Sequence, residues 1–322
     1  MIRPLSIRDH RVLRSPASAR FSVANRGWPP GWRDSSDELI AIECFGSPSK
    51  GHGSTLFVNF TVGWSVIHVS NTMHVAVVLA AGAGTRLGAE QSRVPKPVTS
   101  LLGISLLERA LRSVQAAGID RAVVVVGYRA ELVAAQAHTA AASLDLDLTV
   151  VRNRRWMSGN GSSLLAAAPY VPARFLVVMA DHLIPPSFID LLTETTMGSA
   201  GQLVVDTRPD TVQDIDEATK VRLEGSRIAA IGKKLDPFDA VDTGAFLFDR
   251  RIFDALRDEI SLGRGELSVA VQRLAADGLM HAVPSDGSFW CDVDTPEDLA
   301  VARRVLERQI LASREQAVAA GK

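Results

Sequence analysis

Residues 74–88 read His-Val-Ala-Val-Val-Leu-Ala-Ala-Gly-Ala-Gly-Thr-Arg-Leu-Gly, and Arg93-Val-Pro-Lys-Pro97 follows after a short polar interval. The segment Val75–Ala80 is a short apolar run rich in valine, which is typical of a buried strand. The loop that leaves this strand contains three glycines, and glycine lets successive backbone N–H groups turn toward an anion. The stretch therefore predicts a strand followed by a phosphate-binding loop.

Two well-known phosphate-binding loops do not match this pattern. Gly82, Gly84 and Gly88 are spaced Gly-x-Gly-x-x-x-Gly, whereas a dinucleotide fingerprint needs Gly-x-Gly-x-x-Gly opening directly into a helix. A P-loop ends in Gly-Lys-Ser/Thr, and no such run follows a predicted strand here. A glycine-rich turn with surface cations is the remaining alternative, and the rest of the sequence has to decide between it and an anion site.

The composition is that of a globular chain without a strong charge bias. Its 322 residues are 47% hydrophobic and 22% charged, with a formal net charge of −1. This balance gives no electrostatic reason to expect binding to nucleic acid or to a membrane, so a polyphosphate ligand requires local cations. Cys44 and Cys291 are too few for a disulfide framework, and no Cys/His cluster has zinc-ligand spacing. We therefore expect a cytoplasmic protein without membrane insertion.

Residues 1–72 differ from the rest of the chain. They combine tryptophans, prolines and scattered arginines with little periodicity before about residue 55. The apolar stretch 54–69 is broken by polar residues and is shorter than the roughly 20 residues of a membrane span, and the first residues lack the apolar core of a signal peptide. We predict that residues 1–72 are a poorly ordered or non-native extension and that residues 73–322 form the folded domain.

From Met73 onward, strand-like and helix-like segments alternate. Strands are predicted at 75–80, 122–126, 146–151, 174–179 and 202–206, with helical patterns at 106–114, 130–142 and 162–168 between them. The second half predicts a hairpin at 219–223 and 227–231, a strand at 244–248, and helices at 250–257, 268–276 and from Pro296. This order is typical of an α/β fold, a three-layer doubly wound sheet that is mixed and mostly parallel. Ligands in such sheets bind beyond the carboxyl ends of the strands.

Carboxylates are predicted at the same edge of the sheet. Asp181 directly follows the apolar strand at 174–179, and Trp290-Cys-Asp-Val-Asp-Thr-Pro296 places Asp292 and Asp294 before the last helix. Magnesium in nucleotide enzymes is usually held by one or two carboxylates together with phosphate oxygens and water. The three aspartates are therefore candidate Mg²⁺ ligands, with capping of the last helix as the alternative role for Asp294.

The glycine loop, the proline-flanked lysine in Pro95-Lys-Pro97, Asp181 and the Trp-x-Asp-x-Asp-Thr-Pro segment together resemble the nucleotidyltransferases that make activated sugars and alcohols from a nucleoside triphosphate. The resemblance covers the chain from Met73 to about Arg304 and implies a Rossmann-like fold related to the GT-A fold. Within this superfamily, segments 158–165, 179–182, 217–221, 231–233 and 238–244 most resemble CTP:inositol-1-phosphate cytidylyltransferases.

The resemblance implies transfer of CMP from CTP to inositol 1-phosphate, giving CDP-inositol and pyrophosphate. The acceptor phosphate is already a dianion at neutral pH, so this attack needs no general base. The catalytic residues are then Arg86, toward the leaving pyrophosphate, and Lys96, toward the reacting groups. Asp181 and Asp292 hold Mg²⁺, with Asp294 as a helper, and His182 is a packing or supporting residue rather than an acid.

The resemblance also implies two groups of binding residues. The nucleotide is assigned to Leu79, Ala80, Ala81, Gly82, Gly84, Thr85, Gly159, Asn160 and Gly161, although 159–161 could equally be a bare helix-entry turn. The acceptor is assigned to Lys220, Lys233, Asp242 and Thr243, for which solvated lysines and a simple turn are the alternatives.

Several related functions stay open. A cytidylyltransferase for phosphocholine or a phosphonate is one, although a choline head calls for aromatic side chains, which are scarce at the predicted strand ends of this half. The others are a sugar-1-phosphate uridylyl- or thymidylyltransferase, a GT-A glycosyltransferase and an inactive regulatory subunit. The expected partners are CTP and a phosphorylated small molecule, a separate membrane phosphotransferase that uses the product, and a second copy of the chain in a homodimer.

Overall fold

The structure is a computed structural model that describes residues 54–60, 63–69, 75–87, 94–193, 199–208, 212 and 214–319. The chain divides into two units, Met1–Thr72 and Met73–Lys322. In the first unit, strands β1 (Ser54–Phe60) and β2 (Gly63–Val69) form an antiparallel pair. Residues 1–53 lie outside the described residues, so the prediction of a poorly ordered or non-native extension stays a prediction.

The described part of the second unit contains one nine-stranded sheet with the order β10-β14-β12-β11-β13-β8-β3-β6-β7. Strands β8, β3, β6 and β7 run parallel, and β13 joins them antiparallel to β8. The sheet is mixed, as predicted, but its second half contains more antiparallel pairs than the alternating pattern suggested. The strand bounds are β3 Val75–Ala80, β6 Arg121–Val126, β7 Asp147–Arg152, β8 Arg174–Met179, β10 Gly201–Asp206, β11 Lys220–Glu224, β12 Arg227–Gly232, β13 Ala240–Asp249 and β14 Met280–Pro284.

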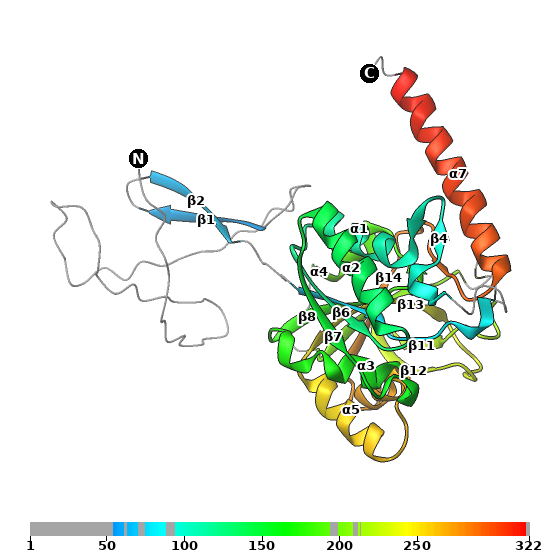
Figure 1. Cartoon of the computed structure of the whole chain (residues 1–322). Coiled ribbons are helices and arrows are strands. Elements are labelled where there is room, and N and C mark those ends of the chain that lie inside the picture. The colour runs from blue at the N-terminus through cyan, green and yellow to red at the C-terminus, as the bar shows by residue number, and fades with distance from the viewer. Residues whose placement is uncertain are drawn as a thin grey trace. The chain divides into compact units, whose positions relative to one another are not determined.

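Helices cover both faces of this sheet, so the predicted three layers are confirmed (Figure 1). Alternate residues of β3 point to opposite faces: Val77 packs in the core beneath α3 (Asn160–Ala166), α5 (Arg251–Ser261) and α6 (Leu267–Ala276). Val78 packs in the core beneath α1 (Leu106–Ala116), α2 (Ala130–Leu144) and α4 (Pro186–Thr193). Burial on both faces explains why these strands read as continuous apolar runs.

Short elements complete the domain at the edge where the parallel strands end. Strand β9 (His182–Leu183) pairs with β15 (Cys291–Asp292), and β4 (Ser100–Leu101) pairs with β5 (Ile104–Ser105). The short 3-10 helices are η1 Thr85–Leu87, η3 Lys96–Val98, η4 Trp156–Ser158 and η5 Ala168–Tyr170. A third, small core joins Leu87 of the glycine loop to Leu183 and Val293.

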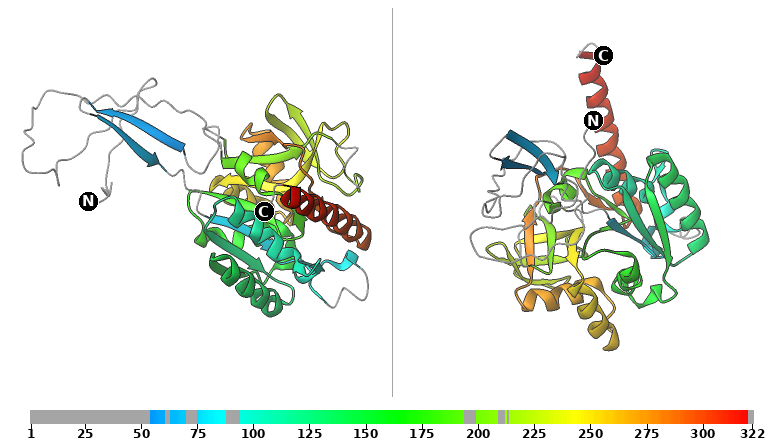
Figure 2. Two further views of the ribbon diagram at one scale, coloured as in Figure 1. Left: turned by 90° about the horizontal axis from the view of Figure 1, so that it is seen from above. Right: turned by 90° about the vertical axis from the view of Figure 1, so that its left-hand side faces the viewer.

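The last helix, α7 (Pro296–Ala319), begins where the sequence predicted and extends away from the sheet in both views of Figure 2. Its first turn is closed by a capping box: Thr295 N–H donates to Asp298 Oδ2 at 2.8 Å, and Asp298 N–H donates to Thr295 Oγ1 at 3.2 Å. No helix among the described residues is long and apolar enough to cross a membrane.

Candidate active site

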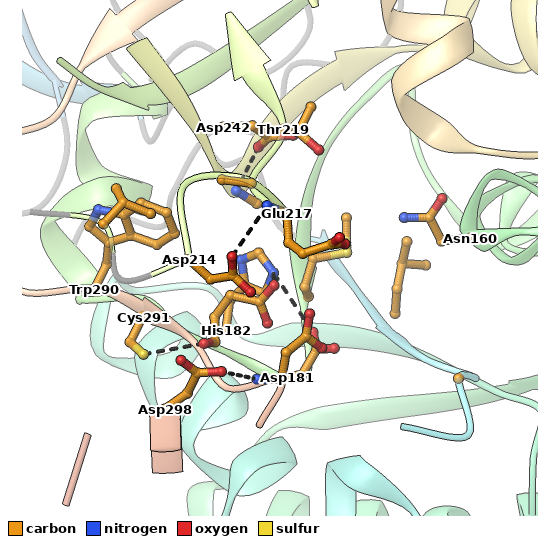
Figure 3. A pocket seen from close by; sticks show the side chains of 18 of the residues that line it. Asn160, Asp181, His182, Asp214, Glu217, Thr219, Asp242, Trp290, Cys291 and Asp298 are labelled. Atoms are coloured by element: carbon orange, nitrogen blue, oxygen red, sulfur yellow. Dashed lines mark hydrogen bonds and ion pairs between the residues drawn. The ribbon is translucent and has the colours of Figure 1, made fainter. Parts of the chain in front are cut away.

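A cavity of about 930 Å³ opens beyond the carboxyl ends of β3 and β8, where the glycine loop was expected to bind its ligand. Its walls come from distant parts of the chain, including Gly82, Asn160, Asp181, Glu217 and Trp290. In Figure 3, Asn160 and Trp290 lie on opposite sides of this cavity, with Asp181 and His182 between them. A smaller cavity of about 210 Å³ adjoins Gly82, Gly84, Arg86 and Lys96.

The glycine loop is shaped around Lys96. Gly84 has φ +66°, and a Cβ at this position would lie 2.2 Å from the Cβ of Lys96. Glycine is therefore required both for the backbone conformation and for the passage of the lysine stem. Around Gly82, in contrast, no described atom lies within 4 Å of the position of a Cβ, so its backbone faces open space in both cavities.

Lys96 is buried among three carboxylates. Its Nζ lies 2.7 Å from Asp181 Oδ2 and 3.3 Å from Asp292 Oδ1, and it also contacts Asp294 Oδ1. Burial disfavours the ammonium, but the three negative charges outweigh this effect and hold the pKa of Lys96 well above its usual range. Lys96 is therefore charged, and the three predicted metal residues meet the predicted catalytic lysine at one point.

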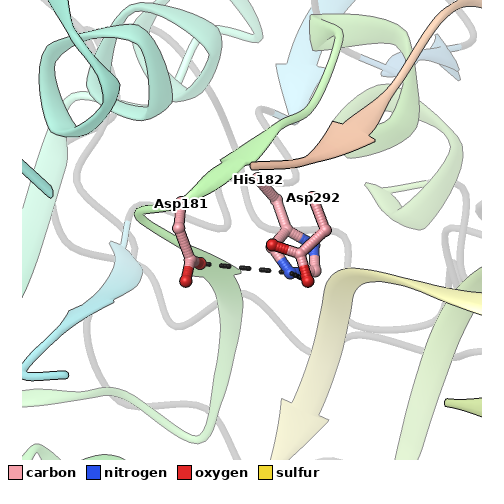
Figure 4. Close-up of side chains that lie close together, drawn as sticks. All are labelled: Asp181, His182 and Asp292. Atoms are coloured by element: carbon pink, nitrogen blue, oxygen red, sulfur yellow. Dashed lines mark ion pairs between the residues drawn. The ribbon is translucent and has the colours of Figure 1, made fainter. Parts of the chain in front are cut away.

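Asp181, His182 and Asp292 form a second contact set within this cluster (Figure 4). His182 Nε2 lies 3.4 Å from Asp292 Oδ2 and 3.9 Å from Asp181 Oδ1, and Nδ1 donates to the carbonyl oxygen of Thr243 at 2.8 Å. Burial lowers the pKa of His182, but the two aspartates and the Thr243 carbonyl raise it to about 10. His182 is therefore an imidazolium that contacts both carboxylates, and its assignment as a supporting residue rather than an acid stays a prediction.

The two carboxylates of this group can hold a divalent cation. The candidate ligand atoms of the group all lie within 4.8 Å of one another, but a His182 ring protonated on both nitrogens has no lone pair for a metal. The Asp181 and Asp292 side chains are 32% and 40% exposed toward the cavity. Carboxylate oxygens that still face solvent suit Mg²⁺, which keeps several waters and binds substrate phosphates. The donor set therefore fits the predicted ion.

Asp294 does not cap the last helix. Asp298 and Thr295 make that cap, whereas Asp294 Oδ2 lies 2.5 Å from Arg86 Nη2. Arg86 also reaches Glu217 Oε2 at 3.4 Å, and Lys233 Nζ reaches the same oxygen at 3.2 Å. Arg86 therefore bridges the carboxylate cluster and the 214–219 turn.

The turn at Gly159-Asn160-Gly161 is held by the loop between α5 and α6. Gly161 N–H donates to the Gly265 carbonyl oxygen at 2.9 Å, and Asn160 Oδ1 accepts from Leu267 N–H at 2.8 Å. A Cβ on Gly159 would lie 2.4 Å from the Gly265 oxygen. Gly159 and Asn160 line the cavity, and the tight packing against Gly265 was not visible in the sequence because the two segments are about 100 residues apart.

Two of the predicted acceptor residues are used within the fold. Lys220 is 9% exposed, and its Nζ donates to the carbonyl oxygens of Lys233, Asp216 and Ala218 at 2.8, 3.1 and 3.5 Å. Thr243 is fully buried, and its hydroxyl donates to the Val204 carbonyl oxygen at 2.7 Å. These bonds differ from the expectation that both side chains face the acceptor.

The other two acceptor residues, Lys233 and Asp242, do line the cavity. Asp242 Oδ1 accepts from Gly244 N–H at 2.7 Å, and burial raises the pKa of this carboxyl to about 6. Phe289 and Trp290 line the cavity as well. The scarcity of aromatic residues at the predicted strand ends is therefore no argument against an aromatic site, because Phe289 and Trp290, which precede Asp292, line the cavity.

The fold and the site define a nucleotide-dependent transferase: a glycine loop at the end of the first parallel strand, two cations and a carboxylate cluster at the same edge of the sheet. The family model of the MobA-like NTP transferase domain matches residues 76–276. The chain belongs to this family, and the predicted nucleotidyltransferase class is confirmed.

Curated relatives and solved structures agree with this assignment. The chain is 40% identical over 237 residues to the "Bifunctional IPC transferase and DIPP synthase" of Rubrobacter xylanophilus, covering 72% of this chain and 51% of the relative. It is 36% identical over 234 residues to the protein of the same name from Archaeoglobus fulgidus, with 72% and 43% covered. The chain thus spans about half the length of these relatives.

Among solved structures, the inositol-1-phosphate CTP transferase from T. maritima aligns with a TM-score of 0.64 at 28% identity, covering 70% of this chain and 91% of that one. A UDP-glucose pyrophosphorylase in complex with UDP-glucose aligns with a TM-score of 0.62 at 17% identity, covering 74% and 100%. The second similarity shows the shared fold alone.

Proposed function

We propose that this chain transfers CMP from CTP to inositol 1-phosphate and releases pyrophosphate and CDP-inositol. The observation that carries the proposal is the contact of the Lys96 ammonium with Asp181, Asp292 and Asp294 beside the glycine loop. The choice of substrates is supported by the T. maritima transferase, most of whose length is aligned. The names of the curated relatives join two activities, and the proposal concerns the nucleotidyl transfer.

In the proposed reaction, the chain supplies positioning and charge neutralisation. A phosphate oxygen of the acceptor, a dianion at neutral pH, forms a bond to the α-phosphorus of CTP. The bond from that phosphorus to the oxygen bridging the α- and β-phosphorus atoms breaks, and pyrophosphate leaves with the electron pair. Arg86 and Lys96 are proposed to neutralise the phosphate charges, and the backbone of the loop at Gly82 is proposed to face the phosphate chain.

Asp181 and Asp292 are the proposed Mg²⁺ ligands, with Asp294 orienting Arg86 and Lys96. When bound, Mg²⁺ would neutralise negative charge on the phosphates. At the nucleotide end, the turn Gly159-Asn160-Gly161 is proposed to contact the base. The loop residues Leu79, Ala80, Ala81, Gly84 and Thr85 are proposed to bind the rest of the nucleotide, with Gly82 at its phosphates. At the other end, Asp242 and Lys233 are proposed to contact the acceptor.

Three broader expectations are part of the proposal. A membrane phosphotransferase activity is proposed to use the CDP-inositol product, because the activated alcohol has to be transferred to a further acceptor. The cytoplasm is the proposed location, as expected from the cysteine content. A homodimer is proposed as the assembly, and its test is the mass of the protein in solution.

The test is a pyrophosphate-release assay that crosses CTP, UTP, dTTP and GTP with inositol 1-phosphate, glucose 1-phosphate, phosphocholine and aminoethylphosphonate. We expect CTP with inositol 1-phosphate to give the highest kcat/KM, because a site that hydrogen-bonds hydroxyls rejects an acceptor lacking them by roughly 10⁴-fold. A higher value for any other pair would refute the substrate assignment and leave the nucleotidyltransferase class intact.

A further inference from the structure

A buried carboxylate holds two side chains in place at one end of the cavity. This end lies opposite the turn Gly159-Asn160-Gly161, where the nucleotide base is proposed to bind. Asp206, the last residue of β10, has a side chain that is 1% exposed. Its Oδ1 accepts from the backbone N–H and the Nε of Arg208, both at 3.0 Å, and its Oδ2 accepts from Arg208 Nη2 at 3.1 Å and from Trp290 Nε1 at 2.8 Å. Asp206 thus fixes a guanidinium and an indole side by side.

Both fixed groups belong to the wall of the active-site cavity. Arg208 and Trp290 line it, and the Arg208 side chain is 45% exposed. Arg208 Nη1 also donates to the Gly287 carbonyl oxygen at 3.1 Å, so the guanidinium is held from two directions. Strand β10 pairs with β13 so that Val205 lies opposite Asp242, which places the Asp206–Arg208 segment beside a proposed acceptor contact.

The position of this wall identifies the part of the substrates that it meets. Trp290 and Asn160 lie on opposite sides of the cavity in Figure 3, so a nucleotide bound at the Asn160 turn leaves the Trp290 side to the acceptor. The two residues that sequence reasoning assigned to this side, Lys220 and Thr243, are used in backbone hydrogen bonds. Recognition of the acceptor has to come from other side chains of the wall.

We propose that Arg208 is a specificity-determining residue that selects an acceptor with a polyhydroxylated ring, and that Asp206 is the positioning residue for Arg208 and Trp290. The guanidinium donates to ring hydroxyl oxygens, and the indole face packs against the C–H bonds of the ring. The acceptor class is a monophosphate of a cyclitol or a pyranose. This inference rests on the proposed function. It adds that Arg208, positioned by Asp206, determines which acceptor the enzyme uses.

The same pair argues against a quaternary ammonium acceptor. The face of Trp290 alone would attract a choline head through a cation–π interaction. Arg208, held next to that face by Asp206, presents N–H donors for which a trimethylammonium group has no acceptor, and such a mismatch is an effective way to reject a competing ligand. The wall therefore favours a neutral polyol over phosphocholine, although it is aromatic.

The test compares Arg208→Gln and Asp206→Asn with the wild-type enzyme, and Asp249→Asn is the control matched to Asp206→Asn. Asp249 makes the same local ion pair, with Arg251 two residues later, but it lies opposite Arg174 at the amino end of β8, on the other edge of the sheet. We expect Arg208→Gln to raise the KM for inositol 1-phosphate about tenfold or more, the cost of a lost charged hydrogen bond, and to leave the KM for CTP within about twofold. The preference for inositol 1-phosphate over phosphocholine falls, and Asp249→Asn changes none of these values.

Asp206→Asn should also raise the KM for inositol 1-phosphate and leave the KM for CTP unchanged, although Arg208 is present. Arg208→Lys should recover only part of the preference for inositol 1-phosphate over phosphocholine. An Arg208→Gln enzyme with an unchanged acceptor KM, or with equal losses for CTP and acceptor, overturns the proposal. If the wild-type enzyme does not use inositol 1-phosphate, the proposed function fails. The variants are then compared with the acceptor that the wild-type enzyme uses best. A rise in the KM for that acceptor without a rise in the KM for the nucleotide decides whether Arg208 selects it.

Discussion

Lys96 draws together carboxylates from two segments that are far apart in the sequence, Asp181 after β8 and Asp292 and Asp294 before α7. A buried ammonium is stable only with compensating charge, and three carboxylates this close together need a cation for the same reason. The site is therefore a balanced cluster in which each charge depends on the others. Loss of one member should affect both activity and stability.

We expect Asp181→Asn to reduce kcat at least about 100-fold, because a neutral amide replaces a carboxylate at the point where the charge of the phosphates is neutralised during the reaction. Circular dichroism should show an intact fold. The measurement is kcat as a function of Mg²⁺ concentration, with the exposed Asp254→Asn as control. Near-normal turnover of Asp181→Asn at saturating Mg²⁺ would exclude Asp181 from the site.

Replacement of Lys96 by Met should abolish activity and lower the free energy of unfolding by on the order of 3 kcal/mol, because it removes the buried cation that contacts all three carboxylates. Mg²⁺ should restore part of this stability, since it supplies the missing positive charge. Urea unfolding with and without MgCl₂ measures both effects, and Lys234→Met, at an exposed position, is the control. An equal response of both variants to Mg²⁺ would contradict this account.

The pH dependence of stability tests the Asp206 network. Burial raises the pKa of Asp206, but the hydrogen bonds from Arg208 and Trp290 lower it more, so its pKa lies below the usual range. The stability that this carboxylate contributes is therefore present above its unfolded pKa, about 3.9, and is lost as the pH falls below that value.

Asp206→Asn should accordingly be destabilised relative to wild type by about 1–3 kcal/mol at neutral pH. The difference should stay constant down to about pH 5 and shrink below about pH 4. Urea unfolding of both proteins across this range is the measurement. A difference that grows on acidification would show that the carboxylate is not held in its ionised form.

At the scale of secondary-structure elements, the sequence predicted the strands and helices whose hydrophobic pattern extends over several residues. Strands β3 and β8 were predicted to the residue, because both faces of these strands are buried and their residues are apolar, apart from Arg174 at the start of β8. The strands β9 and β15 have two residues each, too few to show the alternation of apolar and polar residues that indicates a strand, so their pairing could not be predicted. Yet this pairing sets Asp292 opposite His182. That Lys96, Asp181 and Asp292 lie together could be predicted from the strand ends, whereas the contacts among them and the other residues of the cavity wall depend on tertiary pairing.

The turn Gly159-Asn160-Gly161 is held by the loop between α5 and α6, which carries no recognisable sequence motif. A Cβ on Gly265 would lie 1.5 Å from the Ser158 carbonyl oxygen, so Gly265→Ala has to displace the turn that contains Gly159 and Asn160. We expect the KM for CTP to rise by roughly tenfold or more, because small displacements of positioning groups are costly. Gly232→Ala is the control, since no described atom lies within 4 Å of its Cβ position. A larger effect on the acceptor KM than on the CTP KM would contradict the assignment of this turn.

At the scale of the whole molecule, the composition break at Met73 coincides with the division of the chain into Met1–Thr72 and Met73–Lys322. Among residues whose burial is described, the core begins at Val75. The two faces of the sheet and the small core around Leu87 and Val293 are all built from the second unit. The segments that make up the proposed active site belong to it as well.

We therefore expect a chain that begins at Met73 to fold and to have the same kcat/KM as the full-length protein. The physical reason is that the buried apolar area that stabilises a domain is supplied here by residues of the domain itself. Thermal unfolding and pyrophosphate release, measured side by side for the two proteins, test this expectation. Aggregation of the shorter chain, or a loss of turnover greater than about twofold, would mean that residues 1–72 complete the fold, since a domain that lacks part of its core loses stability in proportion to the missing contacts.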